Sequence, residues 1–170
     1  MGDSDDISAS AASTGAGSST AASSAAHGLR VDFYVMEEAA PAARLKIACR
    51  LAEKAYLASQ RALIWHTDRN ELAALDDMLW TFADGSFVPH EWLTSNAAAA
   101  PVLLSAGPAP TEAFDFVVNL AAEPPPFLHL TRRIAEIIDG DEGRRRAGRA
   151  RFKAYRELGV VPATHALRPE

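Results

Sequence analysis

The chain has 170 residues, of which 48% are apolar and 23% charged, and its 17 basic and 22 acidic residues give a net charge of -5 with neutral histidines. These values suit one soluble domain. No apolar run approaches the roughly 18 residues of a membrane span, and Asp3, Asp5 and Asp6 stand where a secretory signal would be basic. We therefore expect a cytoplasmic protein.

The first part of the chain differs in composition from the rest. Residues 1–28 are nearly all Ser, Ala, Gly, Thr and Asp, with Ile7 as the lone aliphatic anchor, a mixture that cannot bury enough surface to order itself. We expect a disordered extension over 1–28 and a single folded domain over 29–170. The lone Cys49 excludes an intramolecular disulfide and a Cys-based zinc cluster, and is expected to be buried.

Strand and helix patterns alternate along the domain. We predict a strand over 31–36, a helix over 41–59, a strand over 62–65 and a helix from Asp68, which forms a capping box with Glu71, to residue 79. Two strands are predicted over 102–104 and 114–120, followed by helices over 131–138 and 144–158. This order predicts an α/β fold with a mostly parallel sheet flanked by helices on both faces.

The usual signatures of catalysis and cofactor binding are missing. The sequence has no Gly-x-Gly-x-x-Gly motif after the first strand, no phosphate-binding Gly-Lys-Ser/Thr loop and no nucleophile elbow. The five histidines are not spaced as metal ligands. Asp76 and Asp77 point about 100° apart on a helix and are interpreted as a solvated edge. We predict no catalytic residue, no metal and no cofactor.

The last predicted helix is strongly basic. Between Gly143 and Arg156 there are seven basic residues and no acid, which leaves 10 basic against 22 acidic residues elsewhere. One helical face carries four cations around one aromatic ring, namely Arg145, Arg149, Phe152, Lys153 and Arg156. The opposite side, with Ala147, Ala150, Ala154 and Leu158, is expected to pack on the sheet. The face suits an anionic, partly apolar ligand, and the alternative is an ordinary solvated helix face.

A second cluster follows the 68–79 helix. It contains Trp80, Phe82, Phe87, Val88, Pro89, His90 and Trp92, residue types that anchor protein interfaces. The alternative is a loop folded over the core.

These two segments resemble one family. The stretches DDMLWTFADGSFVPHEWL and GRARFKAYRELGV, after an early VDFYV strand, are similar to the chi subunit of bacterial DNA polymerase III holoenzyme, over about residue 30 to the C-terminus. The resemblance implies a nucleotide-binding-like α/β/α fold that binds no nucleotide. It also implies a non-catalytic accessory subunit of a DNA-directed DNA polymerase, in the clamp-loader complex.

The resemblance also implies partners. The psi subunit of the clamp loader would bind Trp80, Phe87, Val88, Pro89 and His90, a surface that a Rad3/XPD-like repair helicase could claim instead. The acidic, Pro-Phe-ending tail of single-stranded DNA-binding protein would bind the last helix at Arg149, Phe152 and Lys153, flanked by Tyr155 and Arg156. Phe152 stands where the family often has tyrosine.

Two other functions stay open on the residues alone. The basic helix could bind single-stranded nucleic acid directly, with Phe152 stacking on a base, although the acidic remainder of the chain would repel DNA. An enzyme acting on a nucleotide rests only on the predicted strand order.

Overall fold

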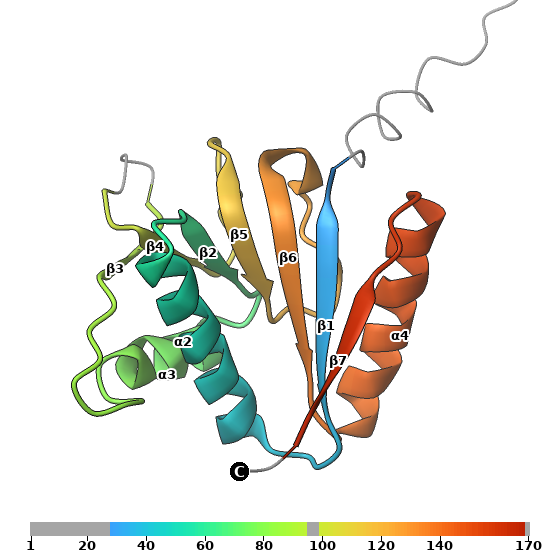
Figure 1. The fold of residues 1–170 in the computed structure, drawn as a ribbon, viewed down its shortest axis with the longest axis horizontal. Coiled ribbons are helices and arrows are strands. Elements are labelled where there is room, and N and C mark those ends of the chain that lie inside the picture. The colour runs from blue at the N-terminus through green and yellow to red at the C-terminus, as the bar shows by residue number, and fades with distance from the viewer. Residues whose placement is uncertain (1–27, 95–98, 169–170) are drawn as a thin grey trace, which may run out of the picture.

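A parallel sheet organises the residues that the structure describes, 28–94 and 99–168, in this computed structural model (Figure 1). The seven strands lie in the order β3-β4-β2-β5-β6-β1-β7, and every neighbouring pair is parallel. The strands are β1 (Arg30–Met36), β2 (Ala62–Trp65), β3 (His90–Trp92), β4 (Val102–Ser105), β5 (Phe114–Asn119), β6 (Thr131–Ile138) and β7 (Ala163–Leu167). The helices are α2 (Pro41–Leu57), α3 (Arg69–Leu79), α4 (Glu142–Glu157) and the short 3-10 helix η1 (Leu128–Leu130).

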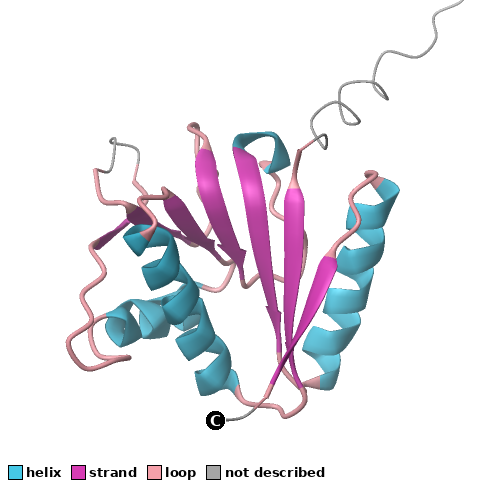
Figure 2. Ribbon diagram, in the orientation of Figure 1, coloured by secondary structure: helices cyan, strands magenta, loops and turns pink. Residues whose placement is uncertain are grey.

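The helices divide between the two faces of the sheet. Helices α2 and α3 cover one face and α4 lies against the other, as Figure 2 shows. Each interface has its own apolar cluster, and the alternation along β1 sends Phe33 toward α4 and Tyr34 toward α2. The predicted α/β fold with helices on both faces is confirmed. Cys49 lies in the α2 cluster, where burial raises the pKa of its thiol to about 12.

Local side-chain chemistry starts two of the helices. Asp68 Oδ1 accepts hydrogen bonds from the backbone N–H groups of Asn70 (2.9 Å) and Glu71 (3.2 Å), so Asp68 is confirmed as the cap of α3. The other half of the predicted capping box is wrong, because the Asp68 N–H donates to His66 Nδ1 and the Glu71 carboxylate contacts His66 and Arg44. Asp141 caps α4 by accepting from the Arg144 N–H at 2.9 Å. None of the helices in 28–94 and 99–168 has both the length and the apolar character needed to cross a bilayer.

Three strands depart from the sequence prediction. The helix predicted over 131–138 is wrong, because this segment is β6, paired with β5 on one side and β1 on the other. The apolar residues Ile134, Ile137 and Ile138 have helical spacing, but a strand inside a parallel sheet is buried on both faces and does not alternate. The short strands β3 and β7 were not predicted. The extension expected over 1–28 lies, apart from Gly28, outside the described residues.

Candidate functional site

The inner face of α4 is held by a buried polar cluster. Arg151 Nε donates to Glu136 Oε2 at 2.8 Å, and the Tyr155 hydroxyl donates to Glu136 Oε1 at 2.6 Å. The residues of α4 that are buried are Gly148, Arg151 and Tyr155. The expectation that Ala147, Ala150, Ala154 and Leu158 form the packing face is therefore wrong, since Ala150 is exposed and the other three are only half-buried.

The outer side of α4 brings most of the predicted binding residues together. Arg149, Lys153 and Arg156 are exposed, and they line a hollow of about 540 Å³ with Phe152 and Glu157. The half-buried ring of Phe152 leans on Phe33, with ring centroids 5.3 Å apart. Arg149 pairs with Glu142 at 3.5 Å and Lys153 with Glu157 at 4.0 Å, and all four side chains are largely in solvent, so these pairs hold the cations only weakly.

One more cation of the predicted basic face, Arg145, is placed differently. Arg145 is half-buried, and its Nη2 donates to the backbone oxygen of Glu37 at 2.8 Å. It lines a second hollow, of about 330 Å³, that lies between α4 and β7 and also touches Arg149, Phe152 and Thr164. Phe152 thus separates two adjoining hollows, and Arg149 borders both.

The predicted aromatic surface is partly exposed. Trp80 is 55% exposed and Phe87 is 62% exposed, and their rings lie side by side with centroids 5.8 Å apart. Pro89 is half-buried. Val88 is fully buried in the α2 cluster, where it anchors the loop. The Trp80 and Phe87 rings are the two large apolar groups that this loop offers to a partner.

Asp76 organises this loop, a role that the sequence interpretation missed. Its Oδ1 lies 2.8 Å from His90 Nε2, and its Oδ2 accepts from Trp92 Nε1 at 3.0 Å. The His90 Nδ1 lies 2.7 Å from the Val88 carbonyl oxygen, and Trp80 packs on the imidazole at 4.7 Å. The interpretation of Asp76 as a solvated edge is wrong. The signal was its spacing, because it lies on the helical stripe of the buried Leu72, Leu75 and Leu79.

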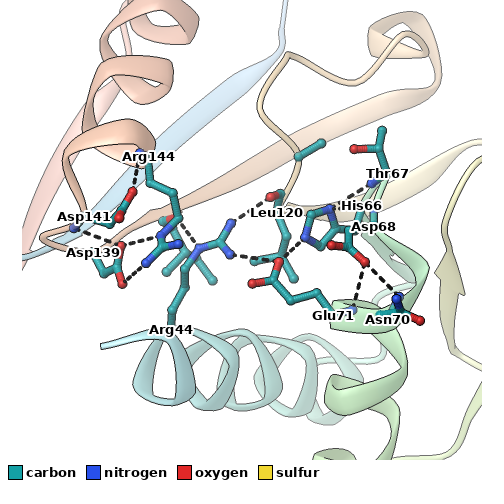
Figure 3. Close-up of polar contacts among 12 residues, drawn as sticks. Arg44, His66, Thr67, Asp68, Asn70, Glu71, Leu120, Asp139, Asp141 and Arg144 are labelled. Carbon is teal, nitrogen blue, oxygen red and sulfur yellow. Dashed lines mark hydrogen bonds and ion pairs between the residues drawn. The ribbon is translucent and has the colours of Figure 1, made fainter. Parts of the chain in front are cut away.

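The carboxyl edge of the sheet is where open α/β proteins bind ligands. Here a hollow of about 320 Å³ lies at that edge, and its charged side chains form ion pairs and hydrogen bonds within the chain, as Figure 3 shows. The buried Arg44 donates to the Leu120 carbonyl oxygen at 2.7 Å and the Ile137 carbonyl oxygen at 3.2 Å, and it pairs with Glu71 at 3.5 Å. His66 Nδ1 accepts from the N–H groups of the next two residues, so Nε2 carries the proton and donates to Glu71.

A second ion pair lies at the same edge. Burial opposes the charge on Asp139, but the bidentate Arg144 guanidinium, at 2.6 and 2.7 Å, and the Ala40 N–H hold the pKa of that carboxyl below its usual range. The charged side chains that Figure 3 labels at this edge thus each contact another group of the chain, namely those of Arg44, Asp68, Glu71, Asp139, Asp141 and Arg144. The imidazole of His66 has no free lone pair for use as a base.

The described residues form a domain of the three-layer α/β class with two exposed surfaces that carry aromatic or basic side chains. A family model described as "DNA polymerase III chi subunit, HolC" matches residues 29–163. The chain therefore belongs to the chi subunit family of DNA polymerase III, and it is an accessory, non-catalytic subunit that works in DNA replication with other subunits of the replication machinery.

Relatives from two bacteria agree with this assignment. The chain is 40% identical over 138 residues to DNA polymerase III subunit chi of Pseudomonas aeruginosa, covering 81% of this chain and 96% of the relative. It is 27% identical over 130 residues to the chi subunit of Haemophilus influenzae, covering 75% and 90%. The C-terminal domain of the DEAD-box protein Dbp5 has a similar fold, with a TM-score of 0.56 at 10% identity over 81% of this chain and 91% of that one.

Proposed function

We propose that this domain bridges single-stranded DNA-binding protein to the clamp loader in the bacterial cytoplasm, at the replication fork. In this proposal the outer side of α4 binds the acidic C-terminal tail of single-stranded DNA-binding protein. The Trp80–Phe87 surface binds the psi subunit or, in its place, a Rad3/XPD-like repair helicase. The observation that carries the proposal is the half-buried Phe152 ring between two hollows, with exposed cations around it.

The chemistry of the α4 surface suits such a tail. Arg149 and Lys153 would bind carboxylates, and Arg149 can bind one through two parallel N–H groups. The apolar wall made by Phe152 and Phe33 would receive an aromatic side chain of the ligand. Each exposed ion pair contributes only about 0–1 kcal/mol, so one tail binds weakly and salt weakens it further. Several tails on one oligomer would raise the overall affinity.

Calorimetric titration of a synthetic acidic peptide ending in Pro-Phe into the full chain tests this assignment. We expect Arg149→Ala and Lys153→Ala each to weaken binding by up to about fivefold and high salt to weaken it in the parent chain. Arg146→Ala is the matched control, because Arg146 is an exposed cation of the same helix that lines neither hollow. Equal losses in all three variants would indicate a nonspecific charge effect. Tighter binding of a single-stranded oligonucleotide than of the peptide would favour direct nucleic-acid binding.

The second surface needs its own test. We expect Trp80→Ala and Phe87→Ala to abolish or strongly weaken binding of a purified psi subunit, because exposed aromatic residues dominate the energy of such contacts. Both side chains are largely in solvent, so the melting temperature should change little. If both variants bind psi as tightly as the parent chain does, the psi-binding site lies elsewhere.

A further inference from the structure

The last strand leaves one edge of the sheet open. β7 pairs with β1 alone in the described part of the chain, from Asp32 opposite Ala163 to Met36 opposite Leu167. Its residues are exposed except for the half-buried Leu167. A strand with one neighbour presents half of its backbone N–H and C=O groups to the outside. β7 also contains no lysine or proline, the residues that commonly block pairing at an edge.

Hollows lie on both sides of this edge. On the α4 side is the 330 Å³ hollow already described, where Thr164 of β7 faces Phe33 and Phe152 beside Arg145 and Arg149. On the α2 side is a hollow of about 350 Å³, in which Leu167 and Arg168 face Ile47, Lys46 and Arg50. Glu37 and Glu38 line the part of this second hollow at the β1–α2 turn.

We infer that the open edge of β7 is a strand-addition site for an extended acidic peptide. Alternate side chains of a strand point to opposite faces, so an eighth strand beside β7 would place one set of side chains toward Phe152 and the other toward Leu167. Cations border both hollows, which favours an acidic segment. A second copy of this chain is disfavoured, because pairing two β7 edges would bring two sets of the same arginines together.

The peptide that would bind this edge is inferred from the α4 surface, because the hollow beside Phe152 extends to β7. The hollow beside Phe152 opens to Thr164 of β7, so a chain anchored by an aromatic residue at Phe152 reaches the strand edge directly. The inference therefore rests on the proposed function, and its occupant is the stretch of the acidic tail that precedes the terminal aromatic residue. It adds a backbone contact that the α4 side chains alone would not make.

The edge is held in place before any ligand arrives. His165 Nε2 lies 2.9 Å from Asp32 Oδ1, and the His165 and Tyr34 rings stack with centroids 5.0 Å apart. Asp32 is fully buried and also accepts from Arg133 Nε at 2.8 Å. A template fixed in this way loses little conformational entropy when a strand adds to it.

A series of backbone-methylated peptides tests strand addition with the unaltered full chain. The parent is the acidic peptide ending in Pro-Phe, and each member of the series carries one N-methyl group at the next position upstream. We expect affinity to fall about three- to tenfold at every second position, where the N–H faces β7, and to stay within about twofold between them. Hydrogen exchange should show slower amides in β7 when the parent peptide is bound.

The outcomes separate this inference from the proposed function. One outcome overturns strand addition alone: the parent peptide binds and Arg149→Ala weakens that binding, but affinity does not alternate along the methylated series and the β7 amides exchange no more slowly. A parent peptide that does not bind overturns both. A dimer of the free chain that the peptide dissociates, seen by sedimentation, would show that the edge pairs with a second copy and would overturn the choice of occupant.

Discussion

Replacing Asp76 should separate the support of the aromatic loop from its contact residues. The His90 side chain is only 2% exposed, so Asp76→Ala would leave its Nε2 group buried without the acceptor it now has at 2.8 Å. Such a loss costs about 1–3 kcal/mol, and the hydrogen bond from Trp92 adds about 1 kcal/mol. We therefore expect Asp76→Ala to lower the free energy of unfolding by about 2–4 kcal/mol.

Asp76→Asn should cost about half as much, because the amide keeps one oxygen acceptor of the two. Urea unfolding followed by tryptophan fluorescence measures these differences. Asp77→Ala is the matched control, since Asp77 is the exposed neighbour on the same helix and should change stability by less than about 0.5 kcal/mol. Equal effects of Asp76→Ala and Asp77→Ala would refute the role of Asp76 in holding β3 and the loop.

Other positions give predictions of known sign. A Cβ at Gly140 would lie 2.3 Å from a backbone oxygen of the β1–α2 turn, which cannot move aside easily, so Gly140→Ala should cost about 3 kcal/mol in urea unfolding. A Cβ at Gly148 would meet the terminal methyl of the Ile138 side chain, which can turn away, so Gly148→Ala should cost only about 1 kcal/mol. Arg44→Met should cost about 2–4 kcal/mol in thermal melts, because the Leu120 and Ile137 carbonyl oxygens lose a buried donor. The pKa of Asp139 is lower in the folded chain than its ordinary value of 3.8. Its ionised carboxylate therefore stabilises the folded chain fully above pH 3.8, and this stabilisation is lost as the pH falls through the pKa of the folded chain. Asp139→Asn should therefore flatten stability against pH below about 4, and an unchanged acid profile would contradict this.

Local sequence patterns predicted the strands and helices whose caps, helix starts or apolar runs lie within the element itself. The Asp68 cap, the Pro41 start and the apolar run of β2 depend on neighbours in sequence. β6 was mistaken for a helix because its charged residues are neutralised from afar, Arg133 by Asp32 and Glu136 by Arg151. β7 carries no apolar alternation, since both of its faces are exposed, and only its pairing with β1 makes it a strand.

The candidate site shows the same division. Arg149, Phe152 and Lys153 are close in sequence on one helix, so helical spacing alone placed them together. The residues that complete the surface, Phe33 and Thr164, come from strands far away in the chain, and no local pattern points to them. Arg151 is one of the seven basic residues of this segment, but its partner Glu136 turns it inward, which no local pattern indicates.

The charged groups of this fold explain why its surfaces and not its crevice are the candidate sites. In open α/β proteins the carboxyl edge is polar because a ligand satisfies it. Here Arg44 and Arg144 satisfy carbonyl and carboxylate oxygens of the same chain at that edge. The groups left exposed lie on opposite layers, the Phe152 side of α4 on one face and the Trp80–Phe87 loop beyond α3 on the other (Figure 1). Because the sheet separates them, a partner on one surface would leave the other accessible, which is the geometry that the proposed bridging function requires.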